Sequence, residues 1–359
     1  MKKVLVVDWL DKYGGAEKVI QALEKCIGFD EVYALANVMN NRELLKMFPY
    51  SQPVKTTFLQ KSGKRFRWLF PLFFWAIDKI RIPENTRLIV SSSHSVAKGV
   101  RKSSPKQVHI SYFQAPNSNY IWQDAPLYFK FLYPAVKWVL PLFRKWDVAD
   151  STHPDFIICN SHYVKDWVKK NYNREADVIY PPVNLDSFQL LTAKEEFYVI
   201  SGRMAAIKRF DVVIEAFNSN DRRLVVIGDG EELSHLKALA KSPKIVFTGF
   251  QEVAAVSGYL QRAKAYIQMG VEGFGIGVIE AQSCGTPVIC YGKGGVVETV
   301  IPGETGLFFK KQTAASLNEC IEIFEHTKFD FHKIHEHARK FSEEHFCETL
   351  KEYIRERLH

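Results

Sequence analysis

Residues 181–201, PPVNLDSFQLLTAKEEFYVIS, decide the fold because they separate two series of strands and helices. Pro181 and Pro182 interrupt the first series, a polar stretch continues to Glu196, and the apolar run Phe197–Ser201 starts the second. Adjacent prolines end regular structure, and alternating strand-like and helix-like segments are typical of parallel α/β sheets. We therefore predict two doubly wound α/β domains that face each other across a cleft, with ligands at the carboxyl ends of the strands.

The individual elements are predicted from apolar runs and the turn residues between them. In the first half we expect strands at Val4–Asp8, Glu31–Leu35, Arg87–Val90, Val108–Tyr112, Phe156–Cys159 and Val178–Tyr180, with helices such as Ala16–Cys26 and Tyr163–Asn171. In the second half we expect strands at Phe197–Ser201, Leu224–Ile227, Ile245–Phe247, Ala265–Gln268 and Val288–Tyr291, followed by a polar helical tail from His332 to His359. The predicted domains are 1–185 and 186–335, with a C-terminal helix, 336–359, that packs back toward the first domain.

The composition suits a protein with two hydrophobic cores. The chain has 359 residues, of which 47% are hydrophobic, which is enough for two domains of ordinary size. Its six cysteines are scattered and include no Cys-x-x-Cys pair, so the sequence indicates neither a disulfide framework nor a zinc site. The apolar part of Met1–Asp8 is too short for a signal peptide and is predicted to be a strand. We therefore expect a reducing, cytoplasmic setting.

The net charge of +8 is unevenly distributed. Between Lys55 and Ile82, seven basic residues and the acid Asp78 are interleaved with phenylalanine and tryptophan, and a second aromatic-basic segment runs from Tyr128 to Trp146. Neither segment has the uninterrupted apolar length of a spanning helix. Both have the composition of segments that lie in a membrane interface, so an anionic membrane surface is a predicted partner; core helices with basic flanks are the alternative. Nucleic acid is not a predicted partner, because no binding motif accompanies the charge.

The segment Glu272-Gly-Phe-Gly-Ile-Gly-Val-Ile-Glu280 carries the strongest indication of ligand binding. Its glycines let the backbone approach a ligand closely. The apolar run Val278–Cys284 is predicted to be a short helix whose amino end suits phosphate. Glu272 precedes the loop and Glu280 is expected in the first helical turn, so two acceptors flank that phosphate site. A nucleotide sugar would satisfy all of these groups; in the alternative, the glycines only turn the chain and Glu280 only complements the helix dipole.

Other candidate residues also follow predicted strands. Gly14-Gly15 follow the strand that ends in Asp8, but they lack the spacing of a dinucleotide fingerprint or a P-loop. Arg203 and Lys208 follow Phe197–Ser201 and could hold a diphosphate, although surface charge is the default for such residues. His94 is a candidate because it follows a strand end.

No metal or other cofactor is expected. The chain has no Asp-x-Asp pair, so the charge of a phosphate must be met by arginine, lysine and helix ends. His332, His335 and His337 lie in the polar tail without ligand-type partners and are expected to be solvated.

The C-terminal half resembles the retaining glycosyltransferases of family 4, which have the GT-B fold of two Rossmann-like domains. The motifs that carry the resemblance are Gly202-Arg203…Lys208, Gly228-Asp229-Gly230-Glu231, Phe247-Thr-Gly249, Glu272–Glu280, Ala281–Pro287 and Gly294-Gly295…Glu298. The N-terminal half is similar to the branch that contains bacterial O-antigen and capsule mannosyltransferases, through Gly14–Glu17, Ser91–Gly99, Arg144–Asp147, Asn160-Ser161 and Ile179–Val183.

The resemblance implies roles for the matching residues. Arg203 and Lys208 would bind the donor diphosphate next to Gly202, Glu272 would bind a sugar hydroxyl, and His94 would contact the donor sugar near the reacting carbon. The remaining implied donor-binding residues are Gly15 at the diphosphate, Gly249 and Phe250 around the base, Glu280 at the ribose, and the backbone of Phe274, Gly275, Ile276, Gly277 and Val278 at the sugar and phosphate.

The resemblance predicts a retaining hexosyltransferase that moves mannose from GDP-mannose onto a lipid-linked bacterial surface polysaccharide precursor, such as that of lipopolysaccharide. A UDP-sugar-dependent enzyme of the same fold and a non-catalytic membrane-docking protein are the alternatives. One segment departs from the mannosyltransferase pattern: His-x-Pro-x-Arg-Tyr is replaced by Gln114-Ala-Pro-Asn-Ser-Asn-Tyr120. The expected location is cytoplasmic and peripheral on the inner face of the cell membrane, and the expected partners are the nucleotide sugar, the lipid-linked glycan and the membrane.

Overall fold

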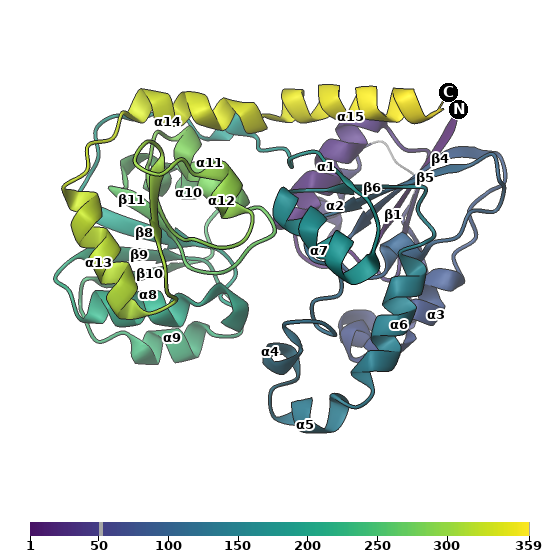
Figure 1. The fold of residues 1–359 in the computed structure, drawn as a ribbon, viewed down its shortest axis with the longest axis horizontal. Helices are drawn as coiled ribbons and strands as arrows, with labels where there is room; N and C mark the ends of the chain where they lie inside the picture. Colours follow the sequence, from purple (N-terminus) through teal and green to yellow (C-terminus); the bar gives the residue numbers. More distant parts are fainter. Residues whose placement is uncertain (50–52, 359) are drawn as a thin grey trace. The chain divides into compact units, whose positions relative to one another are not determined.

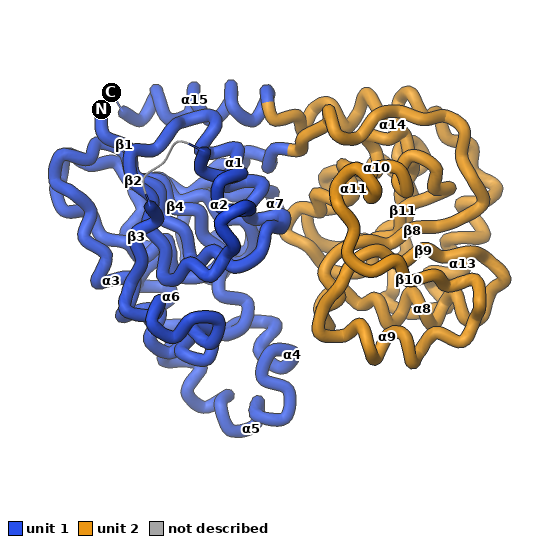
Figure 2. Tube along the Cα trace, turned by 180° about the vertical axis from the view of Figure 1, so that it is seen from behind, with its two compact units in different colours: residues 1–182, 344–359 blue, residues 183–343 orange. Residues whose placement is uncertain are grey.

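The computed structural model describes residues 1–49 and 53–358 and divides the chain into two compact units. Unit 1 contains residues 1–182 and 344–359, and unit 2 contains residues 183–343 (Figure 1, Figure 2). Each unit is built around a parallel sheet with helices on both of its faces.

The sheet of unit 1 has the strand order β3-β2-β1-β4-β5-β6-β7. Its strands are β1 (Lys2–Val7), β2 (Glu31–Ala34), β3 (Lys55–Thr56), β4 (Thr86–Ser93), β5 (Val108–Phe113), β6 (Phe156–Cys159) and β7 (Asp177–Val178). In register, Leu5 of β1 lies between Val32 of β2 and Val90 of β4. Because β1 is covered on both faces, its residues Val4–Val7 are all apolar and fully buried.

Helices and 3-10 segments connect these strands. They are α1 (Gly15–Ile27), α2 (Asn41–Met47), η1 (Phe58–Leu72), α3 (Phe73–Asp78), η2 (Ala97–Gly99), α4 (Ala125–Phe129), η3 (Lys130–Leu132), α5 (Tyr133–Val136), α6 (Leu140–Asp150) and α7 (His162–Tyr172). The last helix of the chain, α15 (Glu343–Leu358), lies in unit 1 from residue 344 onward. No helix within residues 1–49 and 53–358 is long and apolar enough to cross a membrane.

The sheet of unit 2 has the strand order β10-β9-β8-β11-β12-β13. Its strands are β8 (Phe197–Ser201), β9 (Arg223–Ile227), β10 (Ile245–Gly249), β11 (Ala265–Gln268), β12 (Val288–Tyr291) and β13 (Gly306–Phe309). Alternate residues of a strand point to opposite faces. Accordingly, Tyr198 and Ile200 belong to one buried cluster, and Phe197 and Val199 belong to another.

The helices of unit 2 complete the two layers around this sheet. They are η4 (Leu185–Ser187), η5 (Ala206–Lys208), α8 (Phe210–Asn218), α9 (Leu233–Leu239), α10 (Val253–Arg262), α11 (Ile276–Ser283), α12 (Val296–Thr299), α13 (Ala314–Glu325), α14 (Phe331–Ala338) and η6 (Arg339–Phe341). The prediction of parallel α/β sheets is therefore confirmed for both halves of the chain.

The prediction that the chain has no disulfide is wrong. Cys26 of α1 and Cys347 of α15 form a disulfide, with Cα atoms 5.3 Å apart, although their spacing in the sequence gave no sign of a pair. They meet because α15 packs on unit 1, where Phe346 lies against Tyr112. The other four cysteines are buried free thiols.

The second wrong prediction concerns the histidines of α14. His335 Nδ1 lies 2.6 Å from the carbonyl oxygen of Ser283, and His337 Nε2 lies 3.1 Å from that of Thr299. Both rings therefore fasten α14 to unit 2 instead of being solvated, whereas His332 is exposed as predicted.

Candidate functional site

Most of the candidate residues of unit 2 lie at one edge of its sheet. Arg203 and Lys208 follow β8, and Glu272 and the start of α11 follow the neighbouring strand β11. Gly294 and Gly295 follow β12, which is the next strand in the sheet. Because parallel strands end at the same edge, the order of the sheet gathers these residues where doubly wound folds bind ligands.

Lys208 and Glu272 form an ion pair at this edge, through Nζ and Oε1. Their side chains are 27% and 24% exposed, so solvent reaches both. Gln268, the last residue of β11, donates from Nε2 to the same carboxylate oxygen at 3.1 Å and to the carbonyl of Gly270 at 3.1 Å. The structure thus brings two predicted residues together and adds Gln268, which the sequence analysis missed. A polar residue that ends an apolar strand was the available signal.

The loop between β11 and α11 is held by close backbone packing. The N–H of Gly295 donates to the carbonyl of Glu272 at 2.9 Å. A Cβ at Gly295 would lie 2.1 Å from the carbonyl oxygen of Gly273, so no larger residue fits there. Gly275 has φ +96 and is the N-cap of α11, a conformation that glycine adopts without strain. These two positions fix where the helix begins.

This helix begins earlier than predicted. It starts at Ile276, and the N–H of Val278 is already bonded to the carbonyl of Gly275 at 3.0 Å. The open amide groups therefore belong to Ile276 and Gly277, not to Val278. Glu280 lies beyond the first turn and is buried, so the prediction that it stands in the first turn is wrong.

Arg203 projects from the loop that follows β8. This loop is bonded to the next one through Gly202 N–H to the carbonyl of Ile227 at 3.1 Å and Met204 N–H to that of Asp229 at 2.9 Å. The Arg203 side chain is exposed, and among the described residues no ion pair of its guanidinium is found. A cation on an anchored loop thus remains available to an anionic ligand.

The remaining candidates of unit 2 differ in accessibility. Gly249 accepts from the N–H of Gly228 at 2.9 Å, which places it beside the loop after β9. Phe250 follows it and is 70% exposed. Phe274 is buried, and its ring packs on Phe341 with centroids 5.5 Å apart. Only its backbone could therefore face a ligand.

In unit 1, a buried carboxylate builds the corresponding edge. Asp8 follows β1 and accepts four backbone N–H groups, from His94 (2.7 Å), Ser95 (2.9 Å), Val96 (2.6 Å) and Ala97 (2.7 Å). Its Oδ2 also lies 3.2 Å from His94 Nδ1. A hydrogen bond at Nδ1 leaves Nε2 for a ligand, and the His94 side chain is 32% exposed. The sequence analysis placed Asp8 at a strand end but gave it no role; in the structure its carboxylate contacts both the backbone N–H and the ring of His94.

The glycine loop of unit 1 lies at the same edge. Helix α1 starts at Gly15, with Gly14 as N-cap, and Glu17 occupies the third helical position. Its carboxylate bonds back to the loop as in a capping box, and burial raises the pKa of Glu17 to about 7. Gln114, which departs from the family pattern, donates from Nε2 to the carbonyl of Ala16 at 3.2 Å. The departing segment therefore contacts the first turn of α1.

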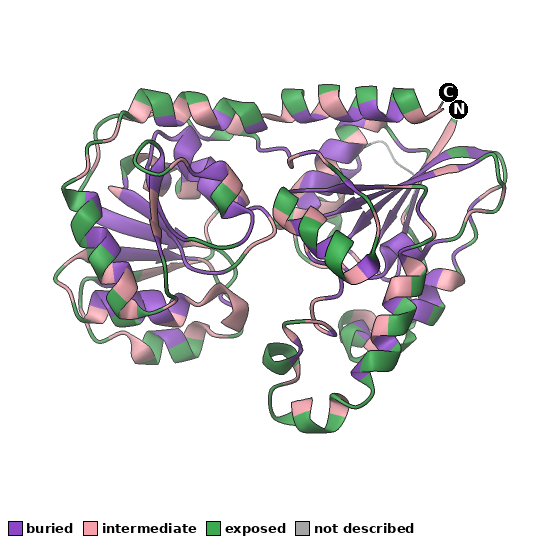
Figure 3. Ribbon diagram, in the orientation of Figure 1, coloured by how far each residue is buried: buried purple, intermediate pink, exposed green. Residues whose placement is uncertain are grey.

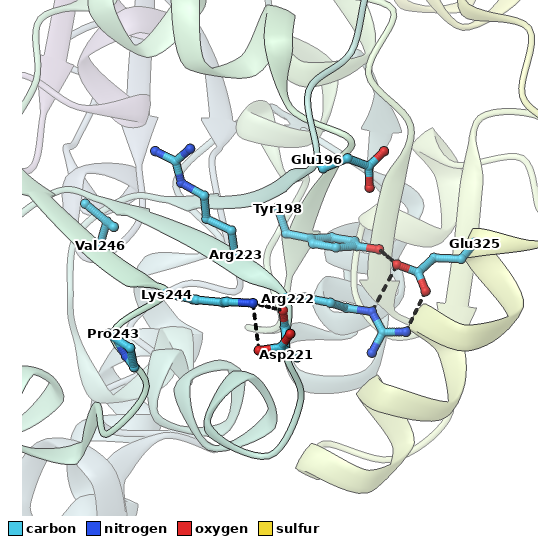
Figure 4. A pocket seen from close by; sticks show the side chains of 9 residues that line it. All are labelled: Glu196, Tyr198, Asp221, Arg222, Arg223, Pro243, Lys244, Val246 and Glu325. Carbon is cyan, nitrogen blue, oxygen red and sulfur yellow. Dashed lines mark hydrogen bonds and ion pairs between the residues drawn. The ribbon is translucent and has the colours of Figure 1, made fainter.

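A separate pocket of about 480 Å³ lies at the opposite edge of the unit 2 sheet (Figure 4). Residues at the amino ends of β8, β9 and β10 line it, and it contains none of the predicted site residues. Arg222 is paired with Glu325 at 2.5 Å, and Lys244 with Asp221 at 2.7 Å. Because Arg222 and Lys244 are paired with neighbouring acids and the predicted site residues lie elsewhere, we do not take this pocket as the candidate site. Within residues 1–49 and 53–358, no group of three or more His, Cys, Asp or Glu side chains is arranged to hold a metal ion.

Comparison with known proteins gives a family match for the second half of the chain. Residues 184–344 match the family described as Glycosyl transferases group 1. The matched segment includes every candidate residue of unit 2. The chain is 30% identical over 184 residues to an uncharacterized glycosyltransferase of Methanocaldococcus jannaschii, covering 48% of this chain and 50% of that protein.

A second relative carries a more specific name. It is a GDP-mannose-dependent monoacylated alpha-(1-6)-phosphatidylinositol monomannoside mannosyltransferase of Corynebacterium glutamicum, 31% identical over 38% of each chain. The chain therefore spans about half or less of the length of these two relatives.

Solved structures show the same fold over the whole chain. Anabaena HepE in complex with UDP matches with a TM-score of 0.72 at 16% identity, covering 99% of this chain and 100% of that one. A sucrose-phosphate synthase from Thermosynechococcus elongatus matches with a TM-score of 0.75 at 16% identity, covering 99% of each chain. The fold is therefore GT-B, with two parallel-sheet Rossmann-like domains.

Proposed function

We propose that this protein is a glycosyltransferase that moves a hexosyl group from a nucleotide sugar. The observation that carries this proposal is the Lys208–Glu272 pair, about one-quarter exposed, at the carboxyl edge of the unit 2 sheet, where Arg203 and the start of α11 also lie. Cations, an acceptor carboxylate and open amide groups together match a sugar linked to a diphosphate. The match of residues 184–344 to glycosyl transferases group 1 supports the same chemistry.

Departure of the nucleoside diphosphate is the chemical difficulty of this reaction. Arg203, Lys208 and the amides of Ile276 and Gly277 stabilise the charge that develops on it. When the donor binds, Lys208 exchanges the Glu272 oxygen for a phosphate oxygen, and Glu272 then accepts from a sugar hydroxyl. Glu280 binds the ribose hydroxyls.

Retention at the anomeric carbon is part of the proposal. No residue stands out as a covalent nucleophile, so the acceptor hydroxyl attacks on the face from which the diphosphate departs. The leaving phosphate takes up the proton of that hydroxyl. His94, oriented by Asp8, contacts the donor sugar near the reacting carbon. No divalent ion takes part in this scheme, so we expect turnover to persist in a chelator such as EDTA.

GDP-mannose is the proposed donor and a lipid-linked saccharide the proposed acceptor. The name of the Corynebacterium glutamicum relative supports this choice. The UDP complex of HepE keeps a UDP-sugar as the second candidate. Gln114, at the position where the mannosyltransferase branch carries histidine, is where a difference in acceptor or donor sugar is expected to arise.

Thermal shifts with GDP-mannose, GDP, UDP and UDP-glucose test the donor. We expect stabilisation by the guanosine compounds, and a shift with uridine compounds alone would overturn GDP-mannose. Turnover tests the site: Arg203→Ala should lower it by ~10²–10³-fold, because a group that stabilises the leaving charge is lost. Arg339→Ala is the matched control, because its side chain is 66% exposed in a surface ion pair. Near-full transfer by the Arg203 variant would contradict the proposed role.

A further inference from the structure

The exposed aromatic residues of unit 1 are concentrated in two segments. Of the seven tryptophans of the chain, the four exposed ones are Trp68, Trp75, Trp138 and Trp146, with Trp68 82% and Trp138 79% exposed. Phe131 is 86% exposed. We call these five side chains the aromatic face. Large apolar groups in such numbers on one region of a surface usually mark an interaction site.

The two segments pack together, although they are far apart in the sequence. Phe70 contacts Phe129 and Phe143, with ring centroids 5.5 Å and 5.6 Å apart. Phe74 contacts Phe143 at 6.2 Å and Trp146 at 5.9 Å. Helices α4 and α5 project from the rest of unit 1, and their residues are mostly exposed (Figure 1, Figure 3).

Each of the two segments contributes some aromatic rings to the core and exposes others. Phe66, Phe73 and Phe74 are buried in the core of unit 1. The core therefore has its aromatic residues without the aromatic face, whose side chains point outward. Folding of unit 1 does not account for three aromatic rings that are more than three-quarters exposed.

The two segments that carry the aromatic face are basic, although Arg67 is paired with Asp11, and Asp78, just beyond Trp75, is paired with Arg101. Residues 58–75 contain four basic residues and no acid, and residues 125–146 also contain four basic residues and no acid. Lys137 lies over the ring of Trp138, with Nζ 5.2 Å from its centroid, and Lys79 lies over Trp75 at 5.4 Å. Arg144 and Lys145 line a hollow of about 330 Å³. Aromatic rings interleaved with cations suit the boundary between lipid headgroups and acyl chains.

We propose that the aromatic face docks on a bilayer that contains anionic phospholipid. Trp68, Phe131 and Trp138 enter the interfacial layer, and Lys64, Lys137 and Lys145 contact the headgroup phosphates. A second copy of the chain fits this face poorly, because a two-fold contact would bring the exposed Lys64, Lys137 and Lys145 of the two copies against one another. This docking surface rests on the proposed function in one respect, because a lipid-linked acceptor would be held at the same bilayer.

Flotation of the full chain with phospholipid vesicles tests the proposal. We expect binding to vesicles of phosphatidylcholine with phosphatidylglycerol, and much weaker binding to phosphatidylcholine alone. The triple variant Lys64→Gln, Lys137→Gln, Lys145→Gln should bind anionic vesicles about a hundredfold more weakly, at roughly fivefold per cation. Its control is Lys241→Gln, Lys310→Gln, Lys311→Gln, because these lysines are exposed in unit 2.

A second set of variants tests the apolar part of the contact. Trp68→Ala, Phe131→Ala, Trp138→Ala should lower binding at least about tenfold, since less apolar area enters the interface. Leu45→Ala with Ile323→Ala is the control, because these side chains are 63% and 61% exposed elsewhere. Circular dichroism verifies that each variant is folded.

The outcomes separate this inference from the proposed function. The docking proposal would be wrong if wild-type protein bound neither kind of vesicle, or if the aromatic variants bound as well as wild type. Either result would stand even if hexosyl transfer were intact. Vesicle binding without turnover of any nucleotide sugar would overturn the proposed function alone. If the aromatic variants convert a dimer to a monomer in sedimentation without changing vesicle binding, the face is a self-association surface and the proposal is wrong.

Discussion

Two lysine–carboxylate ion pairs, one in each unit, differ in how far they are buried. Lys98 and Asp147 in unit 1 are fully buried, with Nζ and Oδ1 2.7 Å apart. Asp147 also accepts from Ser118, Trp122 and Tyr172 at 2.9 Å, 2.7 Å and 2.6 Å. The pair of Lys208 and Glu272 in unit 2 is about one-quarter exposed on each side.

The two pairs consist of the same kinds of residue and differ in burial, so we propose that their surroundings make one pair structural and leave the other able to bind a ligand. The Asp147 carboxylate has no free capacity and no access to solvent, so it holds α6 against η2 and the loop before α4. Water reaches both Lys208 and Glu272, so in the proposed function Lys208 exchanges Glu272 for a phosphate oxygen. A buried pair that loses one partner leaves an uncompensated charge away from water, whereas water can solvate the charge left by a partly exposed pair.

The largest effect is expected from breaking the buried pair. Lys98→Met should lower the free energy of unfolding by about 3–5 kcal/mol, because Asp147 would remain buried without its cation. Lys208→Met should change it by less than about 1 kcal/mol. Urea unfolding of both variants measures the difference, and equal losses would mean that burial does not distinguish the two pairs.

Activity should respond in the opposite order. Lys208→Met should lower turnover of the nucleotide sugar by ~10²–10³-fold, because a cation at the leaving diphosphate is lost. Lys98→Met, assayed at a temperature where it is folded, should keep most of its turnover. If the Lys98 variant lost as much activity per folded molecule as the Lys208 variant, the functional assignment of the exposed pair would be in doubt.

A buried carboxyl without a paired lysine sharpens the comparison. Burial raises the pKa of Glu17 from 4.5 to about 7, so the folded protein keeps a proton that the unfolded chain releases. The stabilising effect of this neutral carboxyl is complete below pH 4.5 and is lost as the pH rises through about 7. Relative to Glu17→Gln, the free energy of unfolding of wild type should fall by on the order of 3 kcal/mol across this range.

Urea unfolding of wild type and Glu17→Gln at several pH values between 4.5 and 7.5 tests this expectation. Asp150, whose pKa burial also raises to about 7, titrates in both proteins and cancels in the difference. Parallel curves for the two proteins would contradict a proton held on Glu17.

The smallest expected effect concerns the residue that orients Glu272. Gln268→Leu removes the N–H donor at 3.1 Å from the carboxylate and should raise the KM for the donor about three- to tenfold, the effect of losing one hydrogen bond worth about 1 kcal/mol. Thermal stability should change little. A lower kcat with an unchanged KM would show that Gln268 acts on the reaction step and not on Glu272.

The sequence predicted elements best where the chain is apolar and continuous. Phe156–Cys159, Phe197–Ser201 and Val288–Tyr291 were predicted at both ends, and each is a strand buried on both faces. Lys55–Thr56 was missed because both of its residues are exposed and polar, and Gly306–Phe309 because it begins with glycine after a turn.

The candidate site was predictable in part for a related reason. Residues that follow apolar strands, such as Arg203 and Lys208, could be placed at a strand edge from the sequence. Their partners could not, since a contact between Lys208 and Glu272 depends on β8 and β11 being neighbours in the sheet. For the same reason the sequence did not reveal Asp8 as the support of His94. The pattern of apolar residues predicts a strand or helix, but it does not predict which other elements pack against it.

The bond between Cys26 and Cys347 has a consequence for the integrity of the molecule. It closes the polypeptide into a covalent ring that includes all of unit 2, because residues 183–343 lie between the two cysteines. One proteolytic cut inside this ring opens it without separating the fragments. A nicked molecule would therefore migrate as a single species until a reductant is added, and the two cysteines would decide whether damage to one unit releases it from the other.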